Sequence, residues 1–368
     1  MKANLNQQEP KRLEQWKKQK IYDHIQSLLK DAPSFIFHDG PPYANGDIHI
    51  GHLLNKVLKD IVVRSQMLLG RRCEFIPGWD CHGLPIEHKV LSEMSSEKKQ
   101  KLANLSPDQE RLAIRNECKK YAEKYIRLQS NQMKRLLTLA DYEAPYLTFQ
   151  PSYESKVLDV FSTMIKEGLV FRQKKPVHWS IANQTALAEA ELEYIDKTSP
   201  SVAVSFEIAS HPFNVSGPVY AVIWTTTPWT LPANAAIAYG EHVSYTLATI
   251  NDQPCIVASN RLDYLKTVCT VSSDTPIQLS ELSGLIAKHP FIDQSSPLLS
   301  APFVTTDDGT GLVHIAPGHG TDDYILGQTH GLPPYSPVRS DGTFDDTVPD
   351  WLQFKSIWDA NSVIIDHL

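Results

Sequence analysis

The sequence predicts an α/β protein in which a doubly wound parallel sheet is followed by a separate, strand-rich domain. Two observations support this fold class. Residues 34–77 show a strand, an amphipathic helix and a second strand at the spacing of a βαβ unit. Beyond Val170 the pattern changes to short segments in which apolar and polar residues alternate. The chain has 368 residues, of which 42% are hydrophobic, enough for cores in two or three domains.

The first elements follow from local sequence patterns. Residues 10–29 have helical spacing and end before a proline, which predicts a helical arm. A strand is expected at 34–37, followed by a loop whose Gly, Pro and Asn content excludes regular structure. A second strand is expected at 73–77. Ligands of such sheets bind at the carboxyl ends of the strands.

The helix between these strands is predicted from its periodicity. Apolar residues recur four apart from Leu53 to Val62, and a polar side lies opposite them. The polar side consists of Lys56, Lys59, Asp60 and Arg64. We therefore expect the apolar side to pack on the sheet.

The remaining elements continue the two-part pattern. Ser106, Pro107 and Gln109 predict the N-terminus of a long helix reaching about Leu139. A further helix is expected near 153–167. Alternating strands are expected at 202–208, 219–224 and 243–250. The expected domains are a helical arm at 1–33, part of an α/β domain at 34–172 and a strand-rich domain at 173–368.

Composition limits the compartment and the cofactors. The N-terminal residues form no secretory signal, and no run of about 18 apolar residues could span a bilayer. We therefore expect a cytoplasmic protein that contacts no membrane. The five cysteines are scattered and form no Cys-x-x-Cys pair, so we expect neither a disulfide nor a metal site, zinc included.

Charge divides the chain unequally. Residues 1–150 hold 24 Lys and Arg against 18 Asp and Glu, whereas residues 151–368 hold 11 against 24. The first part would attract a polyanion such as tRNA, and the acidic second part would have to hold RNA by specific contacts. Charge alone equally fits two solvated surfaces.

A candidate nucleotide site lies where the first loop enters the helix. His49 and His52 are three apart on its first turn, where backbone N–H groups favour phosphate. Both imidazoles could donate hydrogen bonds to a triphosphate, and Gly51 leaves room for a flat purine base. Histidines at a helix start are also common as surface residues or caps.

The surrounding residues resemble the class I aminoacyl-tRNA synthetases in their isoleucine-type form. The segment from Gly40 to His52 matches the family's motif, and 78–87 match a second block. The resemblance implies the first half of a Rossmann-like, HIGH-motif domain with His49 and His52 as catalytic residues. The implied ATP-binding residues are Pro42, Tyr43, Ala44, Asn45, Gly46, His49, Gly51 and His52. The implied amino acid site consists of Gly40, Pro41 and Asp80, although Asp80 could instead cap the next helix.

Two later segments resemble the editing insertion of isoleucyl, valyl and leucyl synthetases. They are residues 223–234 and 309–324. Isoleucine and valine differ by one methylene, which is too little for one binding pocket to tell them apart well. The isoleucyl enzyme is therefore a standard example of an enzyme that needs a second, hydrolytic site. The implied editing residues are Thr225, Thr226, Thr227, Asn234, His314 and Asp323. With no Ser-His-Asp set evident, we expect a positioned water to attack the ester. A β-branched strand, a helix cap and a core histidine are the alternative readings of these residues.

The resemblance implies an isoleucine–tRNA ligase with ATP, accompanied by Mg²⁺, as substrate. The expected partners are tRNA-Ile, L-isoleucine and mischarged Val-tRNA-Ile, with the chain a monomer. The family's lysine loop, KMSKS, and its anticodon-binding domain have no counterpart here, so we expect a fragment with weak adenylate formation. Ser180 and Asn183 occupy places where some relatives carry a cysteine pair. A free-standing editing hydrolase and an inactive remnant remain the alternatives.

Overall fold

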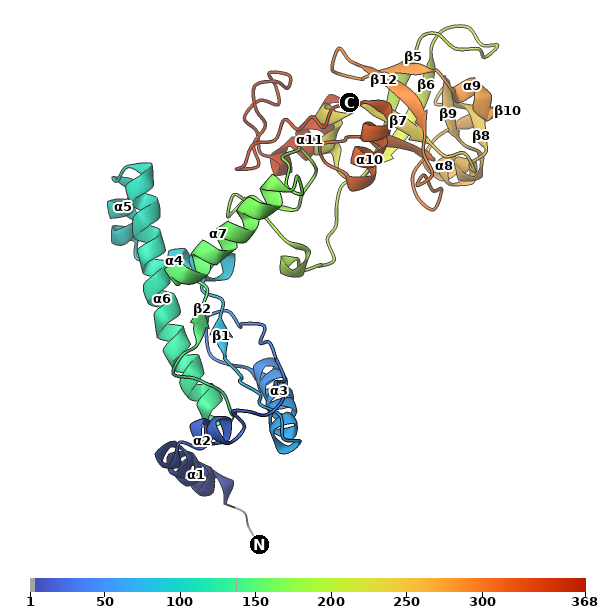
Figure 1. Ribbon diagram of the computed structural model, residues 1–368. Coiled ribbons are helices and arrows are strands. Elements are labelled where there is room, and N and C mark those ends of the chain that lie inside the picture. Colours follow the sequence, from blue (N-terminus) through green and yellow to red (C-terminus); the bar gives the residue numbers. More distant parts are fainter. Residues whose placement is uncertain (1–3, 137) are drawn as a thin grey trace. The chain divides into compact units, whose positions relative to one another are not determined.

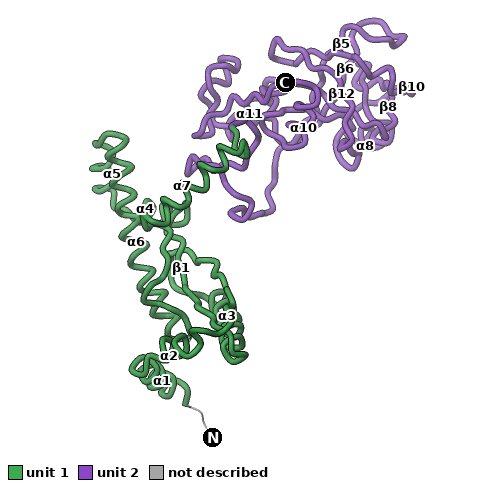
Figure 2. Tube along the Cα trace, in the orientation of Figure 1, with its two compact units in different colours: residues 1–171 green, residues 172–368 purple. Residues whose placement is uncertain are grey.

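The computed structural model describes residues 4–136 and 138–368. The chain forms two compact units, residues 1–171 and 172–368 (Figure 2). The units divide one residue before the boundary expected at 172/173. Each unit is described by itself below.

Seven α-helices lie in the described part of the first unit. They are α1 (Leu5–Gln19), α2 (Ile21–Leu28), α3 (Ile50–Leu68), α4 (Leu84–Glu93), α5 (Ser96–Ala103), α6 (Pro107–Arg135) and α7 (Pro151–Lys166). The arm expected as one helix is two, because Lys20 adopts a left-handed conformation with φ 46° between them. The N-terminus of α6 is confirmed: Ser106 and Gln109 form a capping box, and Pro107 is the first helical residue. Figure 1 shows α6 as the longest element of the unit.

The strands of the first unit differ in position from those expected. Among the residues of this unit that the structure describes, regular pairing is limited to β1 (Gly78–Trp79) and β2 (Tyr146–Leu147), which are parallel. The segment 34–37 contributes only the isolated parallel bridge between Ser34 and Arg72, and Arg72 precedes the expected strand at 73–77, which has no strand pairing. Helix α2 takes over part of the hydrogen bonding, because the Gln26 amide donates to the Cys73 carbonyl at 2.8 Å. The pairing is parallel as predicted, but the two expected strands were wrong.

Helix α3 faces the opposite way from the prediction. Lys56 on its polar side is only 4% exposed, whereas Leu54 and Ile61 on its apolar side are 62% and 57% exposed. The reason is the buried Asp39 carboxylate, which binds Lys56 at 2.6 Å and also contacts Lys59. A buried carboxylate needs cationic partners, and this requirement turns the lysines inward.

The second unit is built on a curved sheet. Its described residues form nine strands in the order β10-β8-β9-β6-β5-β11-β12-β7-β13. Their bounds are β5 (Val202–Ile208), β6 (Val219–Thr225), β7 (Ala236–Tyr239), β8 (Tyr245–Ile250), β9 (Gln253–Ala258), β10 (Val271–Ile277), β11 (Ile286–Lys288), β12 (Ser295–Ser300) and β13 (Leu312–Ile315). Most neighbours are antiparallel, but β6 with β9 and β7 with β12 are parallel. Because β13 also lies against β6, the sheet curves around a common core.

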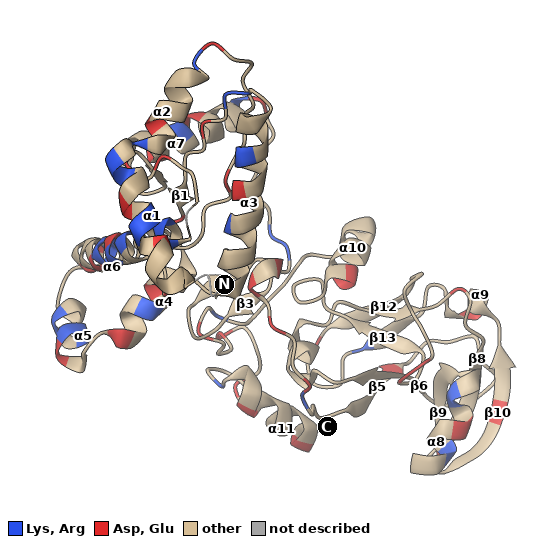
Figure 3. Cartoon of the chain, turned by 90° about the horizontal axis from the view of Figure 1, so that it is seen from below, with Lys and Arg blue, Asp and Glu red and all other residues tan. Residues whose placement is uncertain are grey.

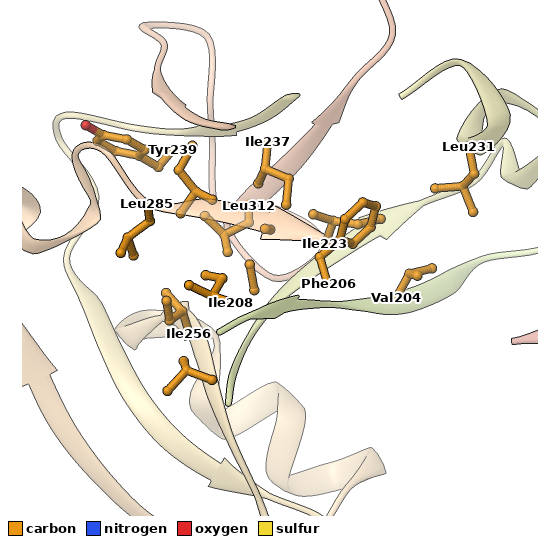
Figure 4. Close-up of a cluster of buried hydrophobic side chains, with 14 of the residues drawn as sticks. Val204, Phe206, Ile208, Ile223, Leu231, Ile237, Tyr239, Ile256, Leu285 and Leu312 are labelled. Atoms are coloured by element: carbon orange, nitrogen blue, oxygen red, sulfur yellow. The ribbon is translucent and has the colours of Figure 1, made fainter. Parts of the chain in front are cut away.

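Alternation of side chains along the strands fills this core. Val204, Phe206 and Ile208 of β5 are all buried, and the residues between them are exposed, as predicted. They pack against Ile223 of β6 and Ile237 of β7 (Figure 4). The expected strand-rich domain is therefore confirmed, and the chain as a whole is an α/β protein.

Short helices and a small ribbon complete the second unit. The α-helices are α8 (Leu262–Val268), α9 (Leu279–Leu282), α10 (Thr321–His330) and α11 (Ile357–His367). The 3₁₀-helices are η1 (Glu189–Glu191), η2 (Pro228–Ala233) and η3 (Ser259–Arg261), and the ribbon pairs β3 (Trp179–Ser180) with β4 (Thr185–Ala186). Helix α11 packs on η2, which follows directly from the carboxyl end of β6.

Candidate active sites

The two histidines of the first candidate site cap helix α3. His49 is the N-cap residue; its Nδ1 accepts a hydrogen bond from the Gly51 N–H at 3.1 Å. The His49 N–H in turn donates to Nδ1 of His52 at 3.2 Å, and the ring centroids lie 4.0 Å apart. Since both Nδ1 atoms accept, the ring proton of each neutral imidazole resides on Nε2. Burial, then His49 and Lys56, lower the pKa of His52.

This geometry gives a phosphate group two donors at one place. The N-terminus of α3 carries a partial positive charge from its unpaired backbone N–H groups. His49 is exposed and His52 half-buried, so both are accessible from outside. Both histidines therefore cap the helix, as the alternative interpretation held. They do so through Nδ1, which leaves Nε2 of each ring for a ligand.

Two glutamines of α6 hold the loop before these histidines. The fully buried Gln129 donates to the carbonyls of Tyr43 and Gly46 at 3.1 and 3.0 Å, and it accepts from the Trp79 indole at 2.9 Å. Gln132 accepts from the backbone N–H of Ile48 at 3.1 Å. Sequence reasoning missed both residues, since nothing local distinguishes them from surface glutamines. Both fix the loop's backbone, and the Gln132 amide also donates to the Asp47 carboxylate at 2.6 Å.

The start of the same loop is tied to α3 by a buried ionic group. Asp39 is 2% exposed and lies between Lys56 and Lys59. Its carbonyl accepts from the Tyr146 hydroxyl at 2.7 Å. Burial lowers the pKa of Lys56, which the Asp39 carboxylate opposes. Gly40 and Pro41 follow Asp39 directly, so this group positions the segment expected to bind the amino acid.

Asp80 lies beside that segment. Its N–H donates to the Pro42 carbonyl at 2.8 Å, and its carbonyl accepts from the Ala44 N–H at 2.9 Å. The structure thus brings together the two sequence blocks that were predicted to share a site. Asp80 does not cap α4, whose N-cap is Gly83; its Oδ1 accepts instead from the His82 N–H at 3.3 Å.

The second candidate site begins at the carboxyl end of β6. Thr225 is buried, whereas Thr226 and Thr227 are exposed just before η2. The Thr227 N–H donates to the Thr225 hydroxyl oxygen at 3.1 Å, and its carbonyl accepts from the Thr230 hydroxyl at 2.8 Å. Thr225 therefore ends the ladder of β6, opposite Val202, and Thr226 and Thr227 form an ordered turn beyond it.

His314 of β13 is joined to this turn through Thr230. The Thr230 hydroxyl gives its proton to Thr227, so it must accept from His314 Nε2, 2.8 Å away. His314 Nδ1 then accepts from the Asn234 amide at 3.0 Å. The Asn234 amide also donates to the Ala236 carbonyl at 2.9 Å. Burial, followed by His289 and His319, lowers the pKa of His314 to about 3.

His314 and Asn234 are therefore a fully hydrogen-bonded pair behind the turn. Both are buried, and the Asn234 side-chain oxygen Oδ1 accepts from the Ser296 hydroxyl. A neutral ring whose two nitrogens are both occupied cannot take a proton from water. The alternative reading of His314 as a satisfied core histidine fits this placement. Thr230, which sequence reasoning did not single out, is the link between the pair and the exposed threonines.

Asp323 lies in the first turn of α10, close to the same cluster. Its Oδ2 accepts from the Ala316 N–H at 2.9 Å, and burial raises the pKa of its carboxyl group. Gly320 makes room for it, since a Cβ there would lie 2.8 Å from the carboxyl carbon. His319 of the same loop meets Trp229 of η2 edge to face, with centroids 5.1 Å apart. The loop between β13 and α10 thus lies against the threonine turn.

Comparison with known families identifies the chain. A family model described as "tRNA synthetases class I (I, L, M and V)" matches residues 11–348. The chain belongs to the class I tRNA synthetases. Its curated relatives include isoleucine–tRNA ligases of Persephonella marina, 42% identical, and Fervidobacterium pennivorans, 44% identical. Both alignments cover 100% of this chain but only 38% and 39% of the relative, so the chain spans about two fifths of their length.

A solved structure is also similar to part of this class I synthetase chain. It is described as "The crystal structure of GlLeuRS-CP1"; it is 16% identical and covers 46% of this chain and 95% of its own, with a TM-score of 0.38. That score is too low to support an argument about this synthetase's site.

The described residues of the synthetase contain neither a metal-binding cluster nor a membrane-spanning helix. In residues 4–136 and 138–368, no three His, Cys, Asp or Glu side chains are grouped so as to hold a metal ion. Ser180 and Asn183, where some relatives carry cysteines, are hydrogen-bonded to each other at 3.0 Å. No helix in the described part of the chain is both long and apolar enough to cross a bilayer.

Proposed function

We propose that the chain carries the ATP-binding motif and the editing site of an isoleucine–tRNA ligase. The observation that carries the proposal is that one class I synthetase chain contains both a histidine-capped helix entrance and, in its second unit, a threonine turn and the half-buried carboxylate of Asp323. The curated relatives that match over the whole chain are isoleucine–tRNA ligases. The proposal implies a cytoplasmic monomer that acts on ATP with Mg²⁺, L-isoleucine and tRNA-Ile.

In the first unit, the loop and α3 would bind ATP and the amino acid. Activation joins a carboxylate oxygen of isoleucine to the α-phosphorus of ATP, and pyrophosphate leaves with the electrons of the broken P–O bond. His49 and His52 would donate from Nε2 to the phosphates as negative charge grows on them. Asp80, whose backbone is bonded to Pro42 and Ala44 across the bridge, would bind the ammonium group. The backbone held by Gln129 would receive the adenosine.

In the second unit, the threonine turn and Asp323 would hold a mischarged Val-tRNA-Ile. The Asp323 carboxylate would bind the ammonium group of the valyl ester, and the hydroxyls of Thr226 and Thr227 would bind the terminal ribose. Water adds to the ester carbonyl carbon, the bond from that carbon to the ribose oxygen breaks, and the ribose oxygen ends protonated. Because neutral His314 has both nitrogens occupied, we assign it to shaping the turn and not to proton transfer.

Deacylation of Val-tRNA-Ile by the purified chain tests the editing half of the proposal. We expect release of valine faster than spontaneous hydrolysis, little release of isoleucine from Ile-tRNA-Ile, and loss of the valine activity in Asp323→Ala and in Thr226→Ala. Asp322→Ala is the matched control, because Asp322 is exposed on the same turn of α10. Valine release at the spontaneous rate, or unchanged release in Asp323→Ala, would refute this half.

A further inference from the structure

His319 is a titratable group of the second unit that the proposed hydrolysis does not yet use. It lies in the loop between β13 and α10 and is half-buried. Its Nε2 atom is buried without a hydrogen bond, and no described residue is hydrogen-bonded to its other ring nitrogen. Buried polar atoms of folded proteins are nearly always paired, so an unpaired ring at a candidate site indicates a group kept free for a ligand or a water.

His319 contacts both segments of the candidate editing site. Its backbone N–H donates to the Ala316 carbonyl at 2.9 Å, and the Ala316 N–H is the group that binds Asp323 Oδ2. Its ring meets the Trp229 ring edge to face, and Trp229 is two residues beyond Thr227. The ring is therefore tied to the loop that carries the expected ammonium-binding carboxylate and packs on the segment that carries the threonine turn.

A hollow of about 710 Å³ reaches this ring from outside. Gly318, His319 and Trp229 are part of its wall. One water needs roughly 30 Å³, so the hollow can hold a water together with part of a substrate. The loop is also held in place, because a Cβ at Gly318 would collide with the Tyr335 carbonyl. The His319 ring is thus fixed at the edge of a space that solvent can enter.

The carboxyl group of Asp323 would bring the reacting carbon of a substrate close to the same loop. Figure 3 shows acidic residues and no Lys or Arg on α10, and within the described part of the chain no cation forms an ion pair with Asp323. Its carboxyl carbon lies against Gly320, the residue after His319. In an aminoacyl ester only the α-carbon separates the ammonium nitrogen from the carbonyl carbon. A substrate whose ammonium group is held at Asp323 therefore has its ester carbonyl near His319.

The protonation state of His319 suits a proton acceptor. Burial lowers the pKa of the ring to about 4, so the ring is neutral at pH 7, and one nitrogen of a neutral imidazole can accept a proton. Both nitrogens of His314 are occupied by hydrogen bonds, whereas those of His319 are not. Negative charge that develops on the ester oxygen favours the protonated ring, so the imidazole becomes a stronger base as the reaction proceeds.

We propose that His319 is a further catalytic residue of the editing reaction, the general base that takes a proton from the attacking water. The water oxygen bonds to the ester carbonyl carbon while one of its protons passes to the free ring nitrogen. When the bond from that carbon to the ribose oxygen breaks, the imidazolium returns the proton to the ribose oxygen, and the ring is neutral again. Asp323 holds the ammonium group and transfers no proton. This inference rests on the proposed function.

Single-turnover deacylation of Val-tRNA-Ile by the intact chain tests the inference. His319→Gln keeps a polar side chain of similar size that cannot take up a proton. We expect its rate constant at a saturating concentration of chain to fall about a hundredfold, while the half-saturating concentration stays the same. His319→Ala should regain rate in added imidazole, and Asp323→Ala should not. His330→Ala, at the exposed end of α10, is the matched control and should keep the full rate.

Three results would overturn the role of His319. The first is a full saturating rate constant in His319→Gln, with thermal melting showing that the variant is folded. The second is imidazole that accelerates the unchanged chain as much as His319→Ala. The third needs no variant: equal rates of release in H₂O and in D₂O would show that no proton moves in the slow step. Release by the unchanged chain at the spontaneous rate refutes the editing function itself, whereas accelerated release that His319→Gln retains refutes the base alone.

Discussion

Acidification should destabilise the second unit through its buried histidines. His289 is 2% exposed and His314 8% exposed, and burial lowers their pKa values to about 4 and about 3 from 6.5. The folded state therefore binds fewer protons than the unfolded chain below pH 6.5. Stability contributed by each neutral ring is complete above 6.5 and is lost as the pH falls from there. His319, with a pKa lowered to about 4, acts in the same direction.

The size of the loss follows from the difference between the folded and unfolded pKa values of each ring. At pH 5, which is 1.5 units below the unfolded pKa of 6.5, the unfolded imidazole is protonated while the folded ring stays largely neutral. The free energy of unfolding therefore falls by about 2 kcal/mol per histidine. The hydrogen bonds explain why the folded ring resists protonation. His289 Nε2 donates to the Leu231 carbonyl at 3.0 Å, and Nδ1 accepts from the Ile292 N–H at 3.1 Å. A second proton would remove that acceptor.

Urea unfolding followed by tryptophan fluorescence at pH 7.5 and pH 5 measures the effect. Five of the seven tryptophans lie in residues 172–368, so the signal reports mainly on the second unit. We expect His289→Gln to reduce the loss of unfolding free energy between the two pH values by about 2 kcal/mol. Leu231→Val, a core change with no titratable group, should lower stability at both pH values and keep the full difference. If His289→Gln loses as much unfolding free energy between pH 7.5 and pH 5 as the unchanged chain, His289 does not cause the loss.

Two further predictions concern the first unit. Gln129→Leu removes the acceptor of the Trp79 indole N–H and the donor to the carbonyls of the loop, so we expect a loss of about 3 kcal/mol or more in urea unfolding and weaker ATP binding by calorimetry. Asn131→Leu, on the exposed side of α6, should change neither quantity. Lys56→Met removes the more buried partner of Asp39 and should cost about 3–5 kcal/mol of unfolding free energy, with a smaller loss in Lys59→Met; equal losses would contradict the assigned burial.

Local signals in the sequence predicted the elements that depend on local interactions. The capping box of Ser106 and Gln109 and the alternation of Val204, Phe206 and Ile208 needed no knowledge of distant residues, and both were confirmed. The motif blocks led to the family, which the match over residues 11–348 shows.

Features that depend on contacts between distant residues could not be predicted in this way. Periodicity finds the two sides of α3 but not which one faces inward, and here the buried Asp39, 17 residues from Lys56, decides it. In the expected strand at 73–77, the Cys73 carbonyl accepts from the Gln26 side chain of α2, 47 residues away, which no local pattern reveals. Gln129 reaches carbonyls 83 to 86 residues distant. The roles of individual site residues remain predictions.

The shared use of His49 by structure and chemistry affects how its variants can be interpreted. Its Nδ1 edge holds the first turn of α3, while its Nε2 edge is the one proposed to reach phosphate. Alanine removes both edges together, so the resulting kinetics would mix a frayed turn with a missing donor. Asparagine places an oxygen near the Nδ1 position and glutamine an amide near the Nε2 position, so this pair of substitutions could assign separate costs to the two edges of one ring.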